Sequence, residues 1–155
     1  MSFRITGLDP QPYVSLYGLD EASLKSHGVI RVMATDDTGF PERVELRAAR
    51  RGESLLLLNH MHQPADTPYR SSHAIFIREG ATVPYEGHDE VPDVMRVRTL
   101  SLRGFDRHHH IASAVVVDGG TAAEAIERLF AMSAVSYVHA HYAAYGCYAA
   151  RVDRV

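Results

Sequence analysis

The stretch Ser54–His62, with the sequence SLLLLNHMH, decides the fold of this chain. Four consecutive leucines are typical of a strand that is buried on both faces, since a half-exposed strand would alternate apolar and polar residues. His60 and His62 follow the leucines, and residues two apart in a strand point to the same face. The stretch therefore predicts an interior strand whose far end carries two imidazoles side by side.

Most other segments around this strand also have the patterns of strands, and helices are few. Asp20 is expected to cap a short helix over residues 21–27, which Gly28 ends. Thr121-Ala-Ala-Glu124 has the spacing of a capping box for a helix that reaches about Met132. The predicted strands are 29–34, 44–48, 54–62, 73–78, 94–105, 110–118, 135–141 and 147–152.

These elements predict an α+β fold: a mixed, mostly antiparallel β-sheet with one main C-terminal helix and a short N-terminal helix. The chain has 155 residues, 46% of them hydrophobic, which suits a single domain over residues 1–155. Residues 1–19 are expected to be an irregular N-terminal arm on a core of residues 20–155. The helix between strands 110–118 and 135–141 predicts a β-α-β crossover. That crossover would place His139 and His141 near the carboxyl end of a parallel strand, where open sheets often bind ligands.

Composition and charge limit the partners and the cellular location that we expect for this protein. The net charge of −3 gives no electrostatic case for a nucleic-acid partner. The longest apolar stretches, 55–58 and 112–117, are too short to span a membrane. The N-terminus has no signal-peptide pattern, and a single cysteine excludes an internal disulfide and fits a reducing compartment. We therefore expect a cytoplasmic protein.

The second pair of histidines, His139 and His141, is followed closely by Cys147. A five-residue hairpin loop over 142–146 would place Cys147 opposite His141, with β-carbons about 5 Å apart, where an imidazolium activates a thiol. This predicts His139 or His141 as a general base and Cys147 as a nucleophile. The alternatives are that both imidazoles are structural groups and that Cys147 is a small buried apolar residue.

The two histidine pairs together also raise the question of a metal. His60, His62, His139 and His141 could bind zinc, nickel or copper if their strands converge. The chain has no HExxH or similar ligand spacing, so no metal site is predicted, and a divalent metal stays an alternative.

A substrate would be held by residues near the end of the leucine strand. Arginine clamps a carboxylate or phosphate with two parallel hydrogen bonds, so Arg70 is a candidate anchor, with Tyr69 beside it. The alternative is that Arg70 lies along the edge of the sheet. His60, His62 and His73 are expected to line the same pocket. The basic residues Arg96, Arg98, Arg103 and Arg107 are expected on a solvent-facing edge strand.

These residues favour a small enzyme, a hydrolase or transferase, or a ligand-binding domain for a small polar or anionic molecule. One alternative is a metabolite-binding module without catalysis. Another is a homodimer that buries its histidine-rich edges and has no active site. Whether the chain is an enzyme depends on the two histidine pairs meeting in space.

Several short motifs, taken in order, resemble one known family. They are Gly39-Phe40-Pro41, Arg43-Val44, Asn59-His60, Thr67–Arg70, Ala74–Phe76, Leu102-Arg103, His139-x-His141 and Gly146-Cys147. From about residue 29 onward their order and spacing resemble the uncharacterised bacterial family named domain of unknown function 1203 (DUF1203). The resemblance implies membership and no reaction. It also implies a cysteine after Gly-Phe-Pro, where this chain has Glu42, and this departure argues against any role that needs two cysteines.

Overall fold

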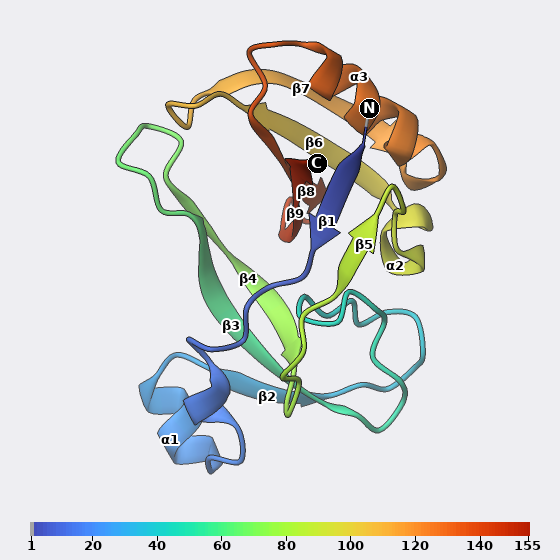
Figure 1. Ribbon diagram of the computed structural model, residues 1–155. Coiled ribbons are helices and arrows are strands. Elements are labelled where there is room, and N and C mark those ends of the chain that lie inside the picture. The colour runs from blue at the N-terminus through green and yellow to red at the C-terminus, as the bar shows by residue number, and fades with distance from the viewer. Residues whose placement is uncertain (1) are drawn as a thin grey trace.

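Two antiparallel sheets make up the computed structural model, which describes residues 2–155. The larger sheet has the strand order β5-β1-β9-β8-β6-β7, and the smaller has the order β2-β3-β4. Figure 1 shows the larger sheet above the smaller one, with α3 at the top and α1 at the bottom. The α+β prediction is confirmed.

The element bounds are as follows. The strands are β1 (Phe3–Thr6), β2 (Ile30–Met33), β3 (Ser54–Gln63), β4 (Ser71–Arg78), β5 (Glu86–His88), β6 (Thr99–Phe105), β7 (Ile111–Asp118), β8 (Tyr137–Tyr142) and β9 (Tyr148–Arg154). The helices are α1 (Glu21–Ser26), α2 (Asp93–Arg96) and α3 (Ala122–Ala131), with 3-10 turns at Val14–Leu16 and Gly119–Thr121.

The leucine strand, β3, is the centre of the smaller sheet. β2 pairs with β3 only between Ser54 and Leu57, whereas β4 pairs with it out to Gln63. Within the described residues, the second half of β3 therefore has β4 as its one strand partner. The two strands form a long hairpin that extends toward the larger sheet (Figure 1).

The larger sheet is covered on both faces. The amphipathic helix α3 buries its apolar residues, among them Ile126, Leu129 and Phe130, in a core shared with Leu100 and Val138. All six residues of β8 are buried, so the face that α3 does not cover must also have a neighbour. Along each strand, the side chains on this second face alternate with the core residues that point toward α3.

β7, α3 and β8 form a crossover whose two strands are not neighbours in the sheet. β7 and β8 run in the same direction, but both pair antiparallel with β6, which lies between them. β6 is thus an interior strand, and the prediction that Arg103 lies on an edge strand is wrong. Arg96 lies in α2 and not in a strand, because the predicted strand 94–105 begins only at Thr99.

Other local predictions are also corrected. Residues 44–48 form no strand, because Leu46 has a φ of 49°, which breaks extended backbone. Residues 1–19 are not wholly irregular, since β1 lies between β5 and β9. Asp20 caps α1 as predicted, with its carboxylate 2.7 Å from the Ser23 amide. Thr121 makes no side-chain cap on α3, so the capping box is absent.

Within residues 2–155, no helix combines the length and the apolar character needed to cross a membrane.

Candidate metal centre

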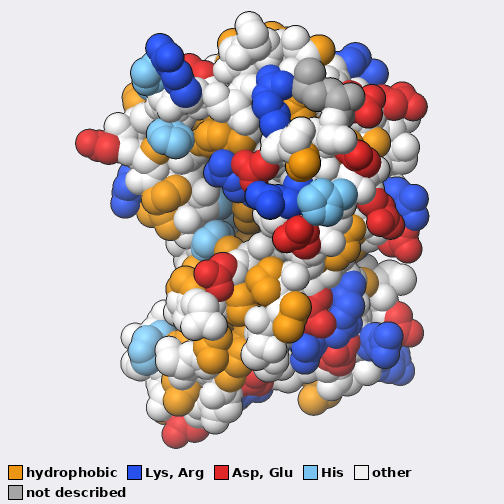
Figure 2. Space-filling view, in the orientation of Figure 1, with side chains coloured by type: hydrophobic (Ala, Val, Ile, Leu, Met, Phe, Trp, Pro, Cys, Tyr) orange, Lys and Arg blue, Asp and Glu red, His pale blue; other side chains and the backbone are white. Residues whose placement is uncertain are grey.

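The far end of the β3–β4 hairpin lies against the face of the larger sheet that α3 leaves uncovered. His62, near the end of β3, has its ring centroid 4.8 Å from that of His141 and 6.1 Å from that of His139. One nitrogen of each ring can be chosen so that all three atoms lie within 4.8 Å of one another. We call these three residues the histidine cluster. In the space-filling view the molecule narrows between the two sheets, and histidine side chains lie in the recess there (Figure 2).

Strand alternation and one bulge place the other side chains of this face. His139 lies opposite Arg103 of β6 and opposite Arg151 of β9. The register of β9 shifts after Ala140, so that Tyr148 lies opposite His141. A bulge of this kind re-aims side chains next to functional sites. Here it brings a tyrosine ring onto the cluster.

The Tyr148 ring packs on all three imidazoles. It stacks on His62 with a centroid distance of 5.3 Å and an interplanar angle of 2°. It meets His139 and His141 nearly edge-on, at 5.4 Å and 5.8 Å. Aromatic contacts of this kind restrict the orientations that the three imidazole rings can adopt.

Hydrogen bonding defines the protonation of His141. Its Nδ1 lies 2.9 Å from the carbonyl oxygen of Gly146. Because a carbonyl oxygen only accepts, Nδ1 carries the proton and Nε2 has a free lone pair. A hydrogen bond of this type orients the histidine ligands of metal sites.

Three ring nitrogens of the cluster have no partner among residues 2–155. They are His62 Nδ1, His139 Nδ1 and His141 Nε2, and all three are buried. Buried polar atoms without partners are rare in folded proteins and call for an explanation, such as a bound ion. Their concentration in one cluster points to a ligand at this place.

The histidines of the cluster are neutral at pH 7. Burial is the main cause that lowers the pKa of His62 to about 4 and the pKa of His139 and His141 to about 3. Positive charges nearby, among them Arg151 beside His139 and Arg103, contribute to the same lowering. Neutral imidazole is the form that binds a metal ion, so the cluster is already in its binding state.

The donor set fits a transition metal of the zinc type. Metal–nitrogen bonds of about 2.1 Å in a tetrahedron place the nitrogens about 3.4 Å apart. In the cluster these nitrogens are up to 4.8 Å apart. Small rotations of the rings, which move each nitrogen by about 1 Å, would bring them to the distance that an ion needs. Three protein ligands leave the fourth position open, as in catalytic zinc sites.

A cavity of about 260 Å³ lies beside the cluster. Tyr137 contributes its hydroxyl, which accepts a hydrogen bond from Gln63 Nε2 at 2.9 Å and lies 2.7 Å from His109 Nδ1. The residues that line the cavity are His62, Gln63, Pro64, Ala65, His109, Tyr137, His139 and Arg151.

The remaining predicted site residues lie outside the cluster. The Nδ1 atom of His60 lies 2.7 Å from the Tyr13 hydroxyl, and His73 lies opposite His60 across the hairpin. Tyr69 packs near Phe105 and His110. Arg70 is exposed and donates to the Pro64 carbonyl, and neither Tyr69 nor Arg70 lines the cavity.

The predicted pairing of Cys147 with His141 is wrong. The Tyr142 amide donates to the Cys147 carbonyl, so the hairpin loop spans only residues 143–146. Cys147 therefore lies on the α3 side of the sheet, buried in the core. Its Sγ accepts a hydrogen bond from Arg43 Nη2 at 3.2 Å, and it borders a separate cavity of about 270 Å³.

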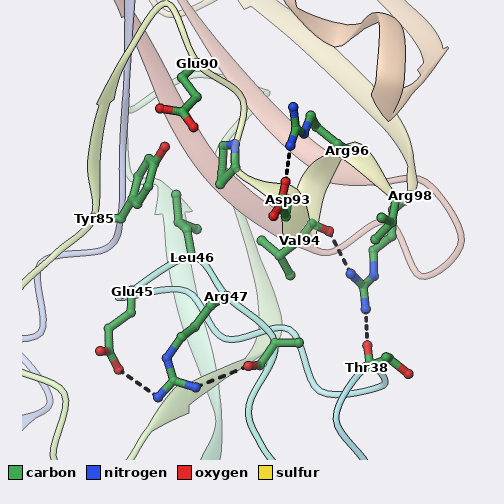
Figure 3. A pocket seen from close by; sticks show the side chains of 13 residues that line it. Thr38, Glu45, Leu46, Arg47, Tyr85, Glu90, Asp93, Val94, Arg96 and Arg98 are labelled. Atoms are coloured by element: carbon green, nitrogen blue, oxygen red, sulfur yellow. Dashed lines mark hydrogen bonds and ion pairs between the residues drawn. The ribbon is translucent and has the colours of Figure 1, made fainter.

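Another cavity, of about 500 Å³, lies between residues 45–48 and 90–98 (Figure 3). Most of the charged groups that line it have partners within the protein. Arg47 pairs with Glu45, and Arg98 donates to the carbonyls of Val94 and Thr38. In contrast to the histidine cluster, it presents no such concentration of unpartnered buried atoms.

Residues 39–154 match the sequence profile of a family described as "Protein of unknown function (DUF1203)". Comparison with curated proteins and with solved structures gives no significant match. The matched span contains the three clustered histidines, Arg103 and Tyr148. Because the match covers most of its 155 residues, the chain belongs to the DUF1203 family, as the motifs of its sequence predicted.

Proposed function

We propose that this chain is a metal-dependent enzyme whose divalent transition-metal ion is held by His62, His139 and His141. The observation that carries the proposal is the convergence of three histidines, each of which has a buried ring nitrogen without a hydrogen-bond partner among residues 2–155. Desolvated, neutral imidazoles in one cluster are costly to leave unsatisfied, and an ion would satisfy all three at once.

The chemistry suggested by an open fourth position is hydrolysis. His62, His139 and His141 would hold the ion, and an ion bound in this way would lower the pKa of a bound water to about 7 and so make hydroxide available near neutral pH. The chain itself would position the reactants. The Gly146 carbonyl keeps the His141 proton on Nδ1, and Tyr137 and Gln63 offer hydrogen-bonding groups to a molecule in the adjoining cavity. In this proposal His139 and His141 act as ligands and not as general bases, and Cys147 takes no part.

A metal-binding module without catalysis is the second candidate. It is favoured by one feature of the cavity: none of the residues that line it, all within the described chain, is an aspartate or glutamate. Many hydrolases use such a carboxylate as a general base. Turnover assays on the zinc-loaded protein separate the two candidates.

The metal site is tested with protein purified without an affinity tag. We expect zinc and cobalt to bind at one ion per chain in calorimetry, and cobalt to give the visible spectrum of a tetrahedral site. His62→Ala, His139→Ala and His141→Ala should each weaken binding by about 100-fold or more. His60→Ala and His73→Ala are the matched controls, because they remove nearby imidazoles outside the cluster, and they should bind like the wild type. Binding that is absent in the wild type, or equally sensitive to the controls, would refute the site.

A further inference from the structure

We infer that the ligand of this centre is a small oxyanion, a carboxylate or a phosphate, bound by Arg103 beside the histidine cluster. The inference deepens the proposed function and depends on it for the metal. The position and the surroundings of Arg103 support the binding of an anion independently of the metal.

Arg103 lies on the cluster face of the larger sheet. It belongs to the interior strand β6 and pairs directly with His139 of β8. Directly opposed residues on antiparallel strands project from the same face, with β-carbons about 5 Å apart. Its guanidinium is therefore within reach of the point on which the three imidazoles converge.

Arg103 has no anionic partner among residues 2–155. Its one hydrogen bond is from Nε to the hydroxyl of Ser101, at 3.4 Å. Arg151, on the other side of His139, contrasts with it: its guanidinium is paired with the Asp153 carboxylate at 2.9 Å. Only one of the two arginines that flank His139 thus has its charge balanced within the protein.

An unbalanced cation in this position favours an anion. Arg103 is partly buried, so the solvation of its guanidinium by water is incomplete. The proposed divalent ion would add two more positive charges beside it. An anionic ligand would supply the negative charge that the described residues do not place beside Arg103.

The geometry of guanidinium selects the kind of anion. Its planar fork matches the two oxygens of a carboxylate or phosphate, and such paired, charge-assisted hydrogen bonds are the strong ones. An uncharged molecule of the same shape would leave the charge of Arg103 unbalanced. We therefore expect acetate and inorganic phosphate to bind and acetamide not to bind.

The test compares these three probes at constant ionic strength, on zinc-loaded and on metal-free protein, by thermal shift and calorimetry. One or both anions should raise the melting temperature, and the stronger of the two identifies carboxylate or phosphate as the natural group. Arg103→Gln should weaken anion binding by about 10-fold or more, and Arg103→Lys should restore part of it. Arg107→Gln, which removes an exposed charge in the β6–β7 turn, is the control and should bind like the wild type.

The outcomes distinguish this inference from the proposed function. Zinc binding without anion binding, or anion binding that survives in folded Arg103→Gln, would overturn the inference and leave the metal site standing. Equal binding of acetamide would also overturn it. Arg103-dependent anion binding in a protein that takes up no metal would support Arg103 as the anion site and refute the metal centre.

Discussion

Tyr148 shows how one residue can organise three others without reacting itself. Its ring contacts every imidazole of the cluster, stacking on one and meeting two edge-on. We predict that Tyr148→Ala lowers zinc affinity by about 10- to 100-fold, because the rings lose their common support. Tyr148→Phe keeps the ring and should retain affinity within about threefold. Competition with a chelating dye measures both variants, and equal losses in the two would assign the effect to the hydroxyl.

The residue types of the site were predictable from the sequence, but their partners were not. The His-x-His spacing correctly placed His139 and His141 on one face, since alternation is a property of any strand. Tyr148 and Arg103 gave no comparable signal. Tyr148 reaches the cluster through a β9 bulge, and Arg103 through the order of strands in the sheet. Both depend on pairing between distant segments.

At the scale of elements, the β3–β4 hairpin is the part that would respond to a metal. Beyond Leu57, β3 pairs only with β4, so this half has fewer neighbours than the half that also pairs with β2. We predict that zinc slows amide hydrogen exchange in residues 58–72, because His62 becomes fixed to β8, while residues 54–57 change little. Mass spectrometry of exchanged peptides measures this. His62→Ala should abolish the zinc effect, and slowing that persists in this variant would place the ion elsewhere.

The sequence also predicted the positions of helices and strands better than it predicted the residues that surround them. The four leucines gave β3 correctly, and Asp20 gave the start of α1. The strand predicted over 44–48 failed because Leu46 adopts a left-handed conformation in a segment without a continuous neighbouring strand. The hairpin loop before β9 is one residue shorter than predicted, which moved Cys147 to the other face. A strand pattern fixes alternation, but a change of one residue in a turn reverses the face.

At the scale of the whole molecule, Arg43 connects the two sheets. Its backbone amide donates to Phe76 of β4, and its side chain donates to the Tyr148 carbonyl of β9 at 2.7 Å. The division into two sheets could not be predicted from sequence patterns, because it is set by contacts such as these between distant residues. The position of His62 over β8 depends on this arrangement.

Glu79 connects several segments around the smaller sheet, and its contribution to stability depends on pH. Its carboxylate accepts hydrogen bonds from Arg31, the Gly18 amide and Ser54. The hydrogen bond from Arg31 is the main cause that lowers the Glu79 pKa from 4.5 to about 2. A lowered carboxyl pKa stabilises the fold above pH 4.5, and this stabilisation is lost as the pH falls through 2.

We therefore predict that Glu79→Gln lowers the free energy of unfolding at pH 7 by about 1–2 kcal/mol. The difference from the wild type should shrink between pH 4.5 and pH 2, where the wild-type carboxylate takes up its proton. Urea unfolding across this range measures it. Glu127→Gln, on the exposed side of α3, is the control and should change little at any pH. A difference that is constant with pH would show that the charge of Glu79 does not contribute.

The rim of the cavity beside the histidines comes from two turns. Pro64 and Ala65 lie at the tip of the β3–β4 hairpin, and His109, with a φ of 64°, lies in the turn between β6 and β7. Turns accept insertions and deletions that strands do not. Relatives with longer or shorter turns would have a wider or narrower entrance above an unchanged set of imidazoles. The width of this entrance is therefore set by the two turns, separately from the strands that carry the three imidazoles.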